Sequence, residues 1–198
     1  MTYAEDMQGK VAERSVAIAQ AAEQAMSPKD EQDKLDPWFV IERLRRNRVG
    51  DADLFVTLFR GRYVYVPEWD KWLYWSGHHW DIDLLSRRAL ADVEQVCAVY
   101  QNALASMGDE GNGPIAKMVR SRMDKLRTAA GRKEVLECAT SIYNPPVVAA
   151  NDLDQQHYLL ATPSGVVDLR TGECSPGKPD QYMLNAIPTE WMGLETPC

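Results

Sequence analysis

Large side chains alternate with a period of two along residues 62–80, RYVYVPEWDKWLYWSGHHW. One set of alternate positions carries tyrosine and tryptophan, and the other carries valine, leucine and tryptophan. Turn-forming residues interrupt the pattern at Pro67–Asp70 and at Ser76–Gly77, which predicts a three-stranded antiparallel meander. A sheet with large groups on both faces either lies between two layers of the fold or offers one face to a partner such as unstacked bases.

Apolar residues recur at helical spacing on both sides of this meander. Asp36 followed by Pro37 is a typical helix start, because aspartate caps a helix and proline fits its first position. Asp83 offers the same capping chemistry ahead of an apolar stripe that begins at Ala89. The predicted helices are residues 10–26, a helix from Pro37 into the segment RLRRNRVG, residues 51–59, a long helix after Asp83, and residues 117–143 with a kink or split at Gly131.

Residues 158–161 and 166–169 predict a C-terminal β-hairpin around the turn Pro163–Gly165, in which Asp168 and Arg170 brace each other by a charged hydrogen bond. The predicted fold class is therefore α+β: a small antiparallel aromatic meander plus a C-terminal β-hairpin packed on three to four helices. We expect an N-terminal helix and acidic linker at 1–35, one domain at 36–190 and a tail at 191–198.

The composition is that of a soluble protein, with 45% hydrophobic and 26% charged residues in 198. No apolar run approaches the roughly 18 residues that span a bilayer, and MTYAEDMQGK does not read as a secretory signal. We therefore expect no membrane contact and a cytoplasmic location. Four widely separated cysteines, Cys97, Cys138, Cys174 and Cys198, form no zinc-binding motif and predict reduced thiols.

The formal net charge of −7 is unevenly distributed. Residues 1–42 carry −5, residues 43–133 carry +5 and residues 134–198 carry −7. A basic middle can contact nucleic acid while acidic ends limit unspecific binding, or it can simply be the solvated surface of helices. The charge distribution alone leaves both interpretations open.

Two segments concentrate the positive charge. The arginines that close the Pro37 helix suit the negative end of the helix dipole, but four within six residues also suit phosphate contact. The segment KMVRSRMDKLR predicts an amphipathic helix with a wide basic face. The candidate nucleic-acid-binding residues are Arg43, Arg45, Arg46, Arg60, Arg62, Lys117, Arg120, Arg122 and Lys125, with Tyr63, Tyr65 and Trp72 as candidate stacking residues.

Motifs for catalysis are missing from the sequence. It contains no GxxxxGK[ST], GxGxxG or GxSxG pattern. Asp81 and Asp83 stand at the spacing that can hold Mg²⁺ from one face of a strand, although we favour helix capping by Asp83. The adjacent His78 and His79 point to opposite faces of a strand and are poorly placed to bind one ion. We expect no catalytic residue, metal or cofactor in this chain.

Two motifs together carry a resemblance to a known family. YVPEWDKWLYWSGHHW resembles the opening motif of the poxvirus primase-helicase N-terminal-like domain of phage and plasmid replication proteins, and LLATPSGVVDLRTGE is similar to its second motif. The resemblance covers roughly residues 50–190, and Ser164 stands where the family usually has asparagine. In that family the domain lies between an N-terminal primase and a C-terminal superfamily 3 helicase, and we expect neither of these within the 198 residues. We therefore expect an excised domain, a prophage remnant or a stand-alone subunit.

The resemblance implies a non-catalytic module of a phage-type replicative primase-helicase in a bacterial host. It would assist DNA engagement and position the helicase ring, with single-stranded or forked DNA and the helicase domain or other replication proteins as partners. The alternative is a protein-interaction or oligomerisation module without DNA binding, which would use the helix at 10–26 and the aromatic face of the meander. Homo-oligomers fit both interpretations.

Overall fold

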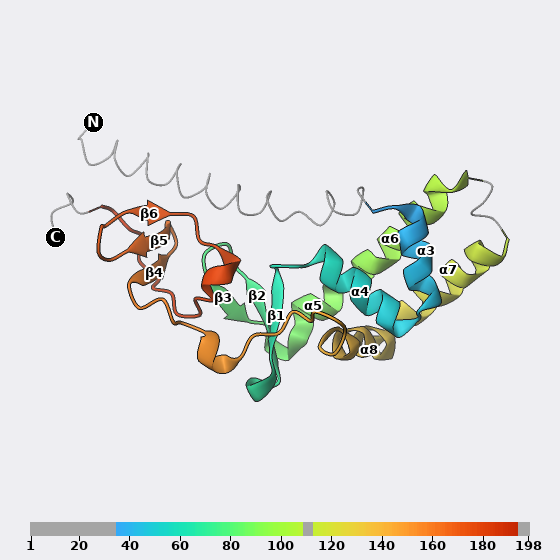
Figure 1. The fold of residues 1–198 in the computed structure, drawn as a ribbon, viewed down its shortest axis with the longest axis horizontal. Helices are drawn as coiled ribbons and strands as arrows, with labels where there is room; N and C mark the ends of the chain where they lie inside the picture. The colour runs from blue at the N-terminus through green and yellow to red at the C-terminus, as the bar shows by residue number, and fades with distance from the viewer. Residues whose placement is uncertain (1–34, 109–112, 194–198) are drawn as a thin grey trace.

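The helices and the two sheets lie along the length of an elongated molecule (Figure 1). The computed structural model describes residues 35–108 and 113–193. Most of the helices gather at one end, a first sheet lies in the middle and a second sheet lies at the other end (Figure 1). The fold class is α+β, as the sequence predicts. The helix expected at residues 10–26 falls outside the described residues.

The helical end begins with the predicted capping motif. The Trp38 backbone N–H donates to Asp36 Oδ1 at 3.0 Å, and Pro37 occupies the first helical position.

No helix of the described residues is long and apolar enough to cross a membrane. The helices are α3 (Pro37–Arg45), α4 (Arg48–Leu58), α5 (Arg87–Asp92), α6 (Glu94–Ser106), α7 (Pro114–Leu126) and α8 (Ala129–Ala139), with 3₁₀ turns η1 (Pro67–Trp69), η2 (Leu84–Ser86), η4 (Ala150–Asp152) and η5 (Pro179–Gln181).

Capping by Asp83 is confirmed, but the long helix predicted after it is two helices. The two Asp83 carboxylate oxygens accept hydrogen bonds from the backbone N–H groups of Arg88 and Ala89, at 3.0 and 2.9 Å. The helical path then breaks at Val93, between α5 and α6. The apolar stripe survives this break, because Val93 is fully buried like the stripe residues before and after it.

The expected split near Gly131 occurs three residues earlier, at Thr128. The Thr128 hydroxyl accepts a hydrogen bond from the Gly131 N–H at 3.0 Å and so caps α8. Gly131 remains essential to this corner, since a Cβ on it would lie 2.1 Å from the Lys125 carbonyl oxygen. Thr128 therefore sets the residue at which α8 begins, and Gly131 allows α8 to lie close to the end of α7.

Both sheets are antiparallel and three-stranded. The meander is confirmed as β1 (Tyr63–Val66), β2 (Lys71–Trp75) and β3 (Trp80–Ile82), in that order. The second sheet contains the predicted hairpin, β4 (Leu159–Thr162) and β5 (Gly165–Asp168), and adds a short strand β6 (Cys174–Ser175) that we did not predict. At its edge Arg170 binds Asp168 in a bidentate pair, with distances of 3.0 and 2.7 Å, as expected.

The aromatic meander lies between two layers, which settles one alternative left open by the sequence. The cross-strand pairs Tyr63–Tyr74 and Tyr65–Trp72 share one face, which packs on the helices. Val64, Leu73, Trp75 and Trp80 form a separate cluster on the other face, under Val148, Leu153, Tyr182 and Leu184 from the C-terminal third. Both faces of this sheet are therefore core.

Candidate nucleic-acid interface

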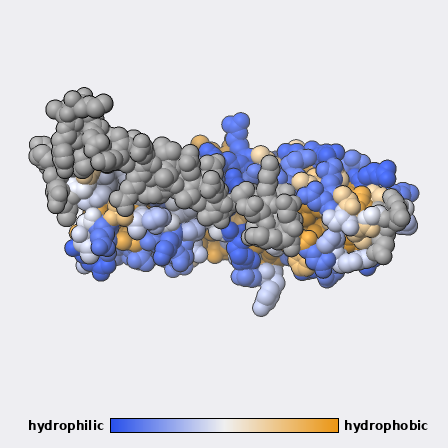
Figure 2. All heavy atoms as spheres, turned by 90° about the horizontal axis from the view of Figure 1, so that it is seen from above, coloured by the Kyte–Doolittle hydropathy of each residue, from blue (hydrophilic) through white to orange (hydrophobic). Residues whose placement is uncertain are grey.

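Helix α7 has one buried side and one basic side. Val119, Met123 and Leu126 are 1%, 6% and 0% exposed and form the predicted apolar stripe. Lys117 and Lys125 stand eight residues apart, which places them on the same side of the helix about 12 Å apart along its axis. The helix thus turns a line of positive charge away from the core. Figure 2 shows that the visible surface of the helical end is largely hydrophilic, with smaller hydrophobic areas between.

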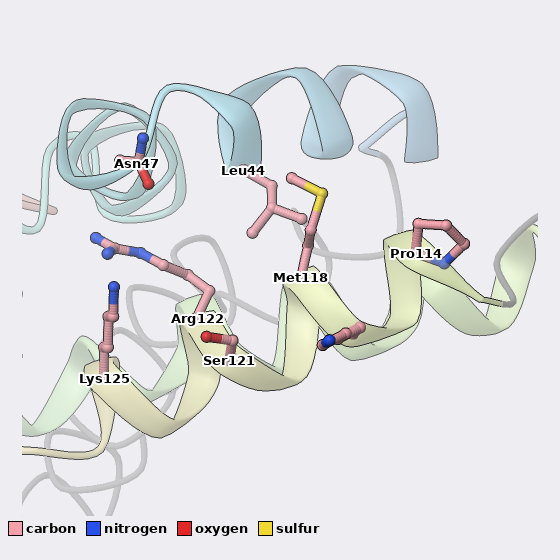
Figure 3. A pocket seen from close by; sticks show the side chains of 8 residues that line it. Leu44, Asn47, Pro114, Met118, Ser121, Arg122 and Lys125 are labelled. Carbon is pink, nitrogen blue, oxygen red and sulfur yellow. The ribbon is translucent and has the colours of Figure 1, made fainter.

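A groove of about 420 Å³ runs between α7 and the corner that joins α3 to α4. Leu44 comes from α3 and Asn47 from the α3–α4 corner, and the other lining side chains project from successive turns of α7 (Figure 3). The structure thus brings the first basic segment of the sequence next to the second one. The lining residues are Leu44, Asn47, Pro114, Lys117, Met118, Ser121, Arg122 and Lys125.

Three of the predicted cations on α7 are available to a ligand. Lys117, Arg120 and Lys125 are exposed. Among residues 35–108 and 113–193, no ion pair involves any of them. Lys117 and Lys125 line the groove, whereas Arg120 does not. The groove therefore carries two uncompensated positive charges along one wall.

The fourth predicted cation of α7, Arg122, is a structural residue. Its side chain is 10% exposed, and its Nε donates to Asp51 Oδ2 at 2.6 Å, with a second ion-pair contact from Nη2. The Tyr100 hydroxyl donates to the other Asp51 oxygen at 2.6 Å. Burial lowers the pKa of Arg122, but the hydrogen bond and charge of Asp51 outweigh it, so the pKa is raised overall. Asp51 therefore neutralises Arg122, and this arginine does not add a free charge to the groove.

The arginines at the end of α3 are mostly engaged. Arg46 Nη1 lies 2.5 Å from Asp53 Oδ2, and Arg43 Nε lies 3.3 Å from the same oxygen without the geometry of a hydrogen bond. Arg43 also lies over the Phe39 ring, 4.1 Å from its centroid. Arg45 alone of the three predicted residues is exposed and outside every ion pair of the described residues. This corner adds less charge to the groove than its sequence predicts.

Arg60 and Arg62 lie away from the groove. They follow the last turn of α4, whereas the groove adjoins the residue before its first turn, roughly 16 Å away along the helix. Arg62 pairs with Asp92 at 3.7 Å and lies over Phe59, while Arg60 is exposed. The structure does not bring these two arginines together with those of α7.

The predicted stacking residues are largely inside the protein. Tyr63 and Trp72 are 2% and 4% exposed, and Tyr63 donates a hydrogen bond to Asp92 at 2.6 Å. Burial, followed by this hydrogen bond, raises the pKa of Tyr63. Tyr65 is half-buried, and its hydroxyl donates to Asp70 at 2.7 Å. Because the rings of Tyr63 and Trp72 pack in the core, neither is placed to stack on a base.

The Asp81–Asp83 pair is divided between two structural tasks. Asp83 is 3% exposed and caps α5, and Asp81 lies 3.1 Å from His79 Nε2. The two carboxylates therefore do not converge. Among the residues that the structure describes, no group of three or more His, Cys, Asp or Glu side chains could hold a metal ion.

Sequence reasoning missed several groove residues. Ser121 falls midway between Lys117 and Lys125 at helical spacing, so the pattern could have placed it on the same face. Asn47 could not be found this way, because its backbone has a positive φ of 55° and its position depends on the turn between two helices. The sequence indicates only on which side of the helix Met118 and Pro114 lie, and nothing in it marks them as binding residues.

Comparison with known proteins gives a match, and it covers the part of the chain that holds the two motifs. Searches against curated proteins and against solved structures found no match. A family model described as "D5 N terminal like" matches residues 52–198, about three quarters of the chain. This range includes both motifs from which we recognised the family, and the match confirms that resemblance. The chain belongs to the D5 N-terminal-like family, the N-terminal domain of phage, plasmid and viral primase-helicase proteins.

Proposed function

We propose that this replication-associated module is non-catalytic and holds single-stranded DNA along the groove between α3 and α7, which positions the strand for the helicase ring. The observation that carries the proposal is a pair of exposed lysines on one wall of that groove, Lys117 and Lys125, which form no ion pair within residues 35–108 and 113–193. Lysines that are free of carboxylate partners can replace the counterions of DNA phosphates, which drives sequence-independent binding. A phage or prophage setting and a cytoplasmic location in a bacterial host stay predictions from the resemblance.

Two further exposed cations lie on the helices that border the groove. Arg45 ends α3 and Arg120 lies on α7, but neither lines the groove itself. The two lysines on the groove wall pair with no carboxylate of the described residues, so we expect electrostatic attraction to contribute strongly to the affinity. Binding driven in this way depends strongly on salt and weakly on base sequence.

A salt titration tests the proposal. We expect the chain to bind a labelled oligothymidylate of about twenty nucleotides, and log affinity to fall linearly with log salt between about 50 and 200 mM. The double variant Lys117→Gln, Lys125→Gln should bind more weakly, with a slope reduced by about 1.4, because each lost phosphate contact in single strands removes about 0.7.

The matched control is Lys71→Gln, Lys133→Gln, which removes two exposed lysines on β2 and α8 and changes the net charge equally. It should leave most of the slope intact. Absence of binding at low salt, or an equal loss of slope in both double variants, would contradict the proposal.

One observation favours the alternative of a protein-interaction module. Ile82 at the end of β3 is 43% exposed, and Leu84 and Leu85, which follow the buried Asp83, are 72% and 81% exposed. Leu85 has a φ of 59°, which is unfavourable for leucine. Asp83 fixes this turn by capping α5, so both leucines are held outward. Exposed apolar groups of this kind mark contacts with another protein, here a second copy of the chain.

Light scattering separates the two functions. If the leucines mediate self-association, the chain is an oligomer and Leu84→Ser, Leu85→Ser is a monomer at the same concentration. A monomeric chain whose DNA affinity is unchanged by this double substitution would reject the alternative. The aromatic face of the meander cannot serve as the contact surface, because it packs against the helices.

A further inference from the structure

The groove has a chemically divided lining that electrostatic guidance of a strand does not require. Leu44, Pro114 and Met118 supply an apolar part, and Lys117, Ser121 and Lys125 supply a polar and cationic part. Figure 3 shows the Met118 thioether reaching from α7 toward Leu44 on α3. Leu44 is 3% exposed, whereas Met118 remains 44% exposed. Core packing therefore explains Leu44 but not the thioether left open beside two lysines.

The size of the groove exceeds the need of a phosphate. Its volume of about 420 Å³ lies within the range of roughly 300–1,000 Å³ that is typical of sites for small organic ligands. Such sites combine an apolar lining with a few placed polar groups, which is the composition found here. A ligand that matches both parts carries a negative charge and a flat apolar group.

Asn47 adds a group that could orient this ligand. Its backbone adopts φ 55° and ψ −133°, an uncommon conformation that places the side chain in the groove instead of on the first turn of α4. Its amide nitrogen lies 3.5 Å from the Arg45 carbonyl oxygen, a long hydrogen bond. An asparagine amide offers one acceptor and two donors, which suits the hydrogen-bonding edge of a base.

We infer that the groove seats one nucleotide of the bound single strand, with its phosphate between Lys117 and Lys125 and its base against Met118. This inference rests on the proposed function and names what that function places in the groove. A polarisable thioether makes favourable contacts with aromatic rings, and a base presents such a ring. With two lysines for the phosphate and Met118 for the base, the groove should bind a strand with accessible bases more tightly than a strand of equal charge without bases.

An abasic strand separates base contact from charge. We compare a labelled oligothymidylate of about twenty nucleotides with an abasic phosphodiester strand of the same length and charge, using the full chain at one salt concentration. The oligothymidylate should bind about fivefold to tenfold more tightly, since each stacked base contributes measurably to affinity. Met118→Ala should bring the two affinities together and leave the salt slope unchanged.

Val49→Ala serves as the control, because it shortens an apolar side chain of comparable exposure, 42%, outside the groove lining. It should keep the preference for the strand that carries bases. Circular dichroism should show both variants folded, as both side chains are substantially exposed.

Other outcomes overturn the inference in distinguishable ways. Equal, salt-dependent affinity for the two strands would reject a seated base and leave the proposed function standing. A base preference that Met118→Ala does not change would place the base elsewhere. Thymidine monophosphate binding as tightly as the strand would identify a free nucleotide as the ligand. Failure of both strands to bind at low salt would reject the proposed function and the inference with it.

Discussion

The segment at the α3–α4 corner and the segment of α7 are both rich in basic residues, but these residues have different surroundings. At the corner, Arg43 and Arg46 share the carboxylate of Asp53, and Arg48 lies 3.4 Å from Glu134. On α7, Lys117 and Lys125 are exposed and pair with no carboxylate of the described residues. A basic stretch of sequence thus becomes a basic surface only where the fold brings no acid to it.

Helix α4 causes much of this difference. Its first turns carry Asp51 and Asp53, two residues apart and therefore on different sides of the helix. Asp53 pairs with Arg43 and Arg46 at the end of α3, while the fully buried Asp51 pairs with Arg122 from α7. One helix therefore withdraws charge from both basic segments and leaves the lysines on the groove wall.

The sharpest test compares these two aspartates. Asp51→Ala leaves the buried guanidinium of Arg122 without a partner and removes the acceptor of the Tyr100 hydroxyl. Breaking a buried pair in this way costs about 3–5 kcal/mol, so we expect a loss of that size in the free energy of unfolding by urea. Asp53→Ala removes a surface partner of Arg46 and should cost less than about 1 kcal/mol.

An apolar replacement of the whole network is the further control. The triple variant Asp51→Leu, Tyr100→Phe, Arg122→Met leaves no buried charge or unpaired hydroxyl and should recover much of the lost stability. Equal destabilisation by Asp51→Ala and Asp53→Ala would show that Asp51 is not the buried anchor that separates the two regions.

The second test concerns the tightness of the α3–α4 corner. A Cβ on Gly50 would lie 1.8 Å from the Arg43 carbonyl oxygen, so the two helices approach through this glycine. We expect Gly50→Ala to lower the free energy of unfolding by about 1–3 kcal/mol, since backbone must shift to relieve the overlap. Gly113→Ala, with a φ of 68° but no atom within 4 Å of the added Cβ, should lose about 1 kcal/mol or less.

A stability of Gly50→Ala equal to that of the natural chain would mean that the corner can open without cost. Because Arg43 would then move, its pairing with Asp53 could not be what withholds it from a ligand. Chemical denaturation of the two glycine variants at one temperature gives this comparison directly.

The pattern of apolar residues predicted most local structure, because caps, turns and alternation act within a few residues. Asp36–Pro37 and the meander are examples, and the stripe through Val93 kept its phase across a break that the sequence did not reveal. The pattern could not say what covers each face of the meander. That depends on Val148 and Leu153, which lie far along the chain.

Arg122 shows what a closer reading could have found. It stands between Val119 and Leu126, within the apolar stripe of α7, where a charged residue needs a buried partner. The sequence could thus have predicted its burial, but not its pairing with Asp51, 71 residues away. The availability of each cation depends on the tertiary structure, and for this reason the sequence pattern could not show that Arg43, Arg46 and Arg122 are paired.

The last test asks whether pairing alone distinguishes the corner from α7. Asp53→Asn keeps the shape of the side chain but removes the charge that holds Arg43 and Arg46. If these arginines are then free, affinity for the oligothymidylate should rise about threefold to tenfold, and the salt slope should steepen by about 0.7 for each arginine recruited. Glu137→Gln on α8 changes the net charge equally, but Glu137 forms no ion pair with an arginine of the described residues. An equal gain in both variants would mean that net charge, and not the release of the corner, controls binding. A gain confined to Asp53→Asn would show that Asp53, by pairing with the corner arginines, restricts DNA to the groove of α7.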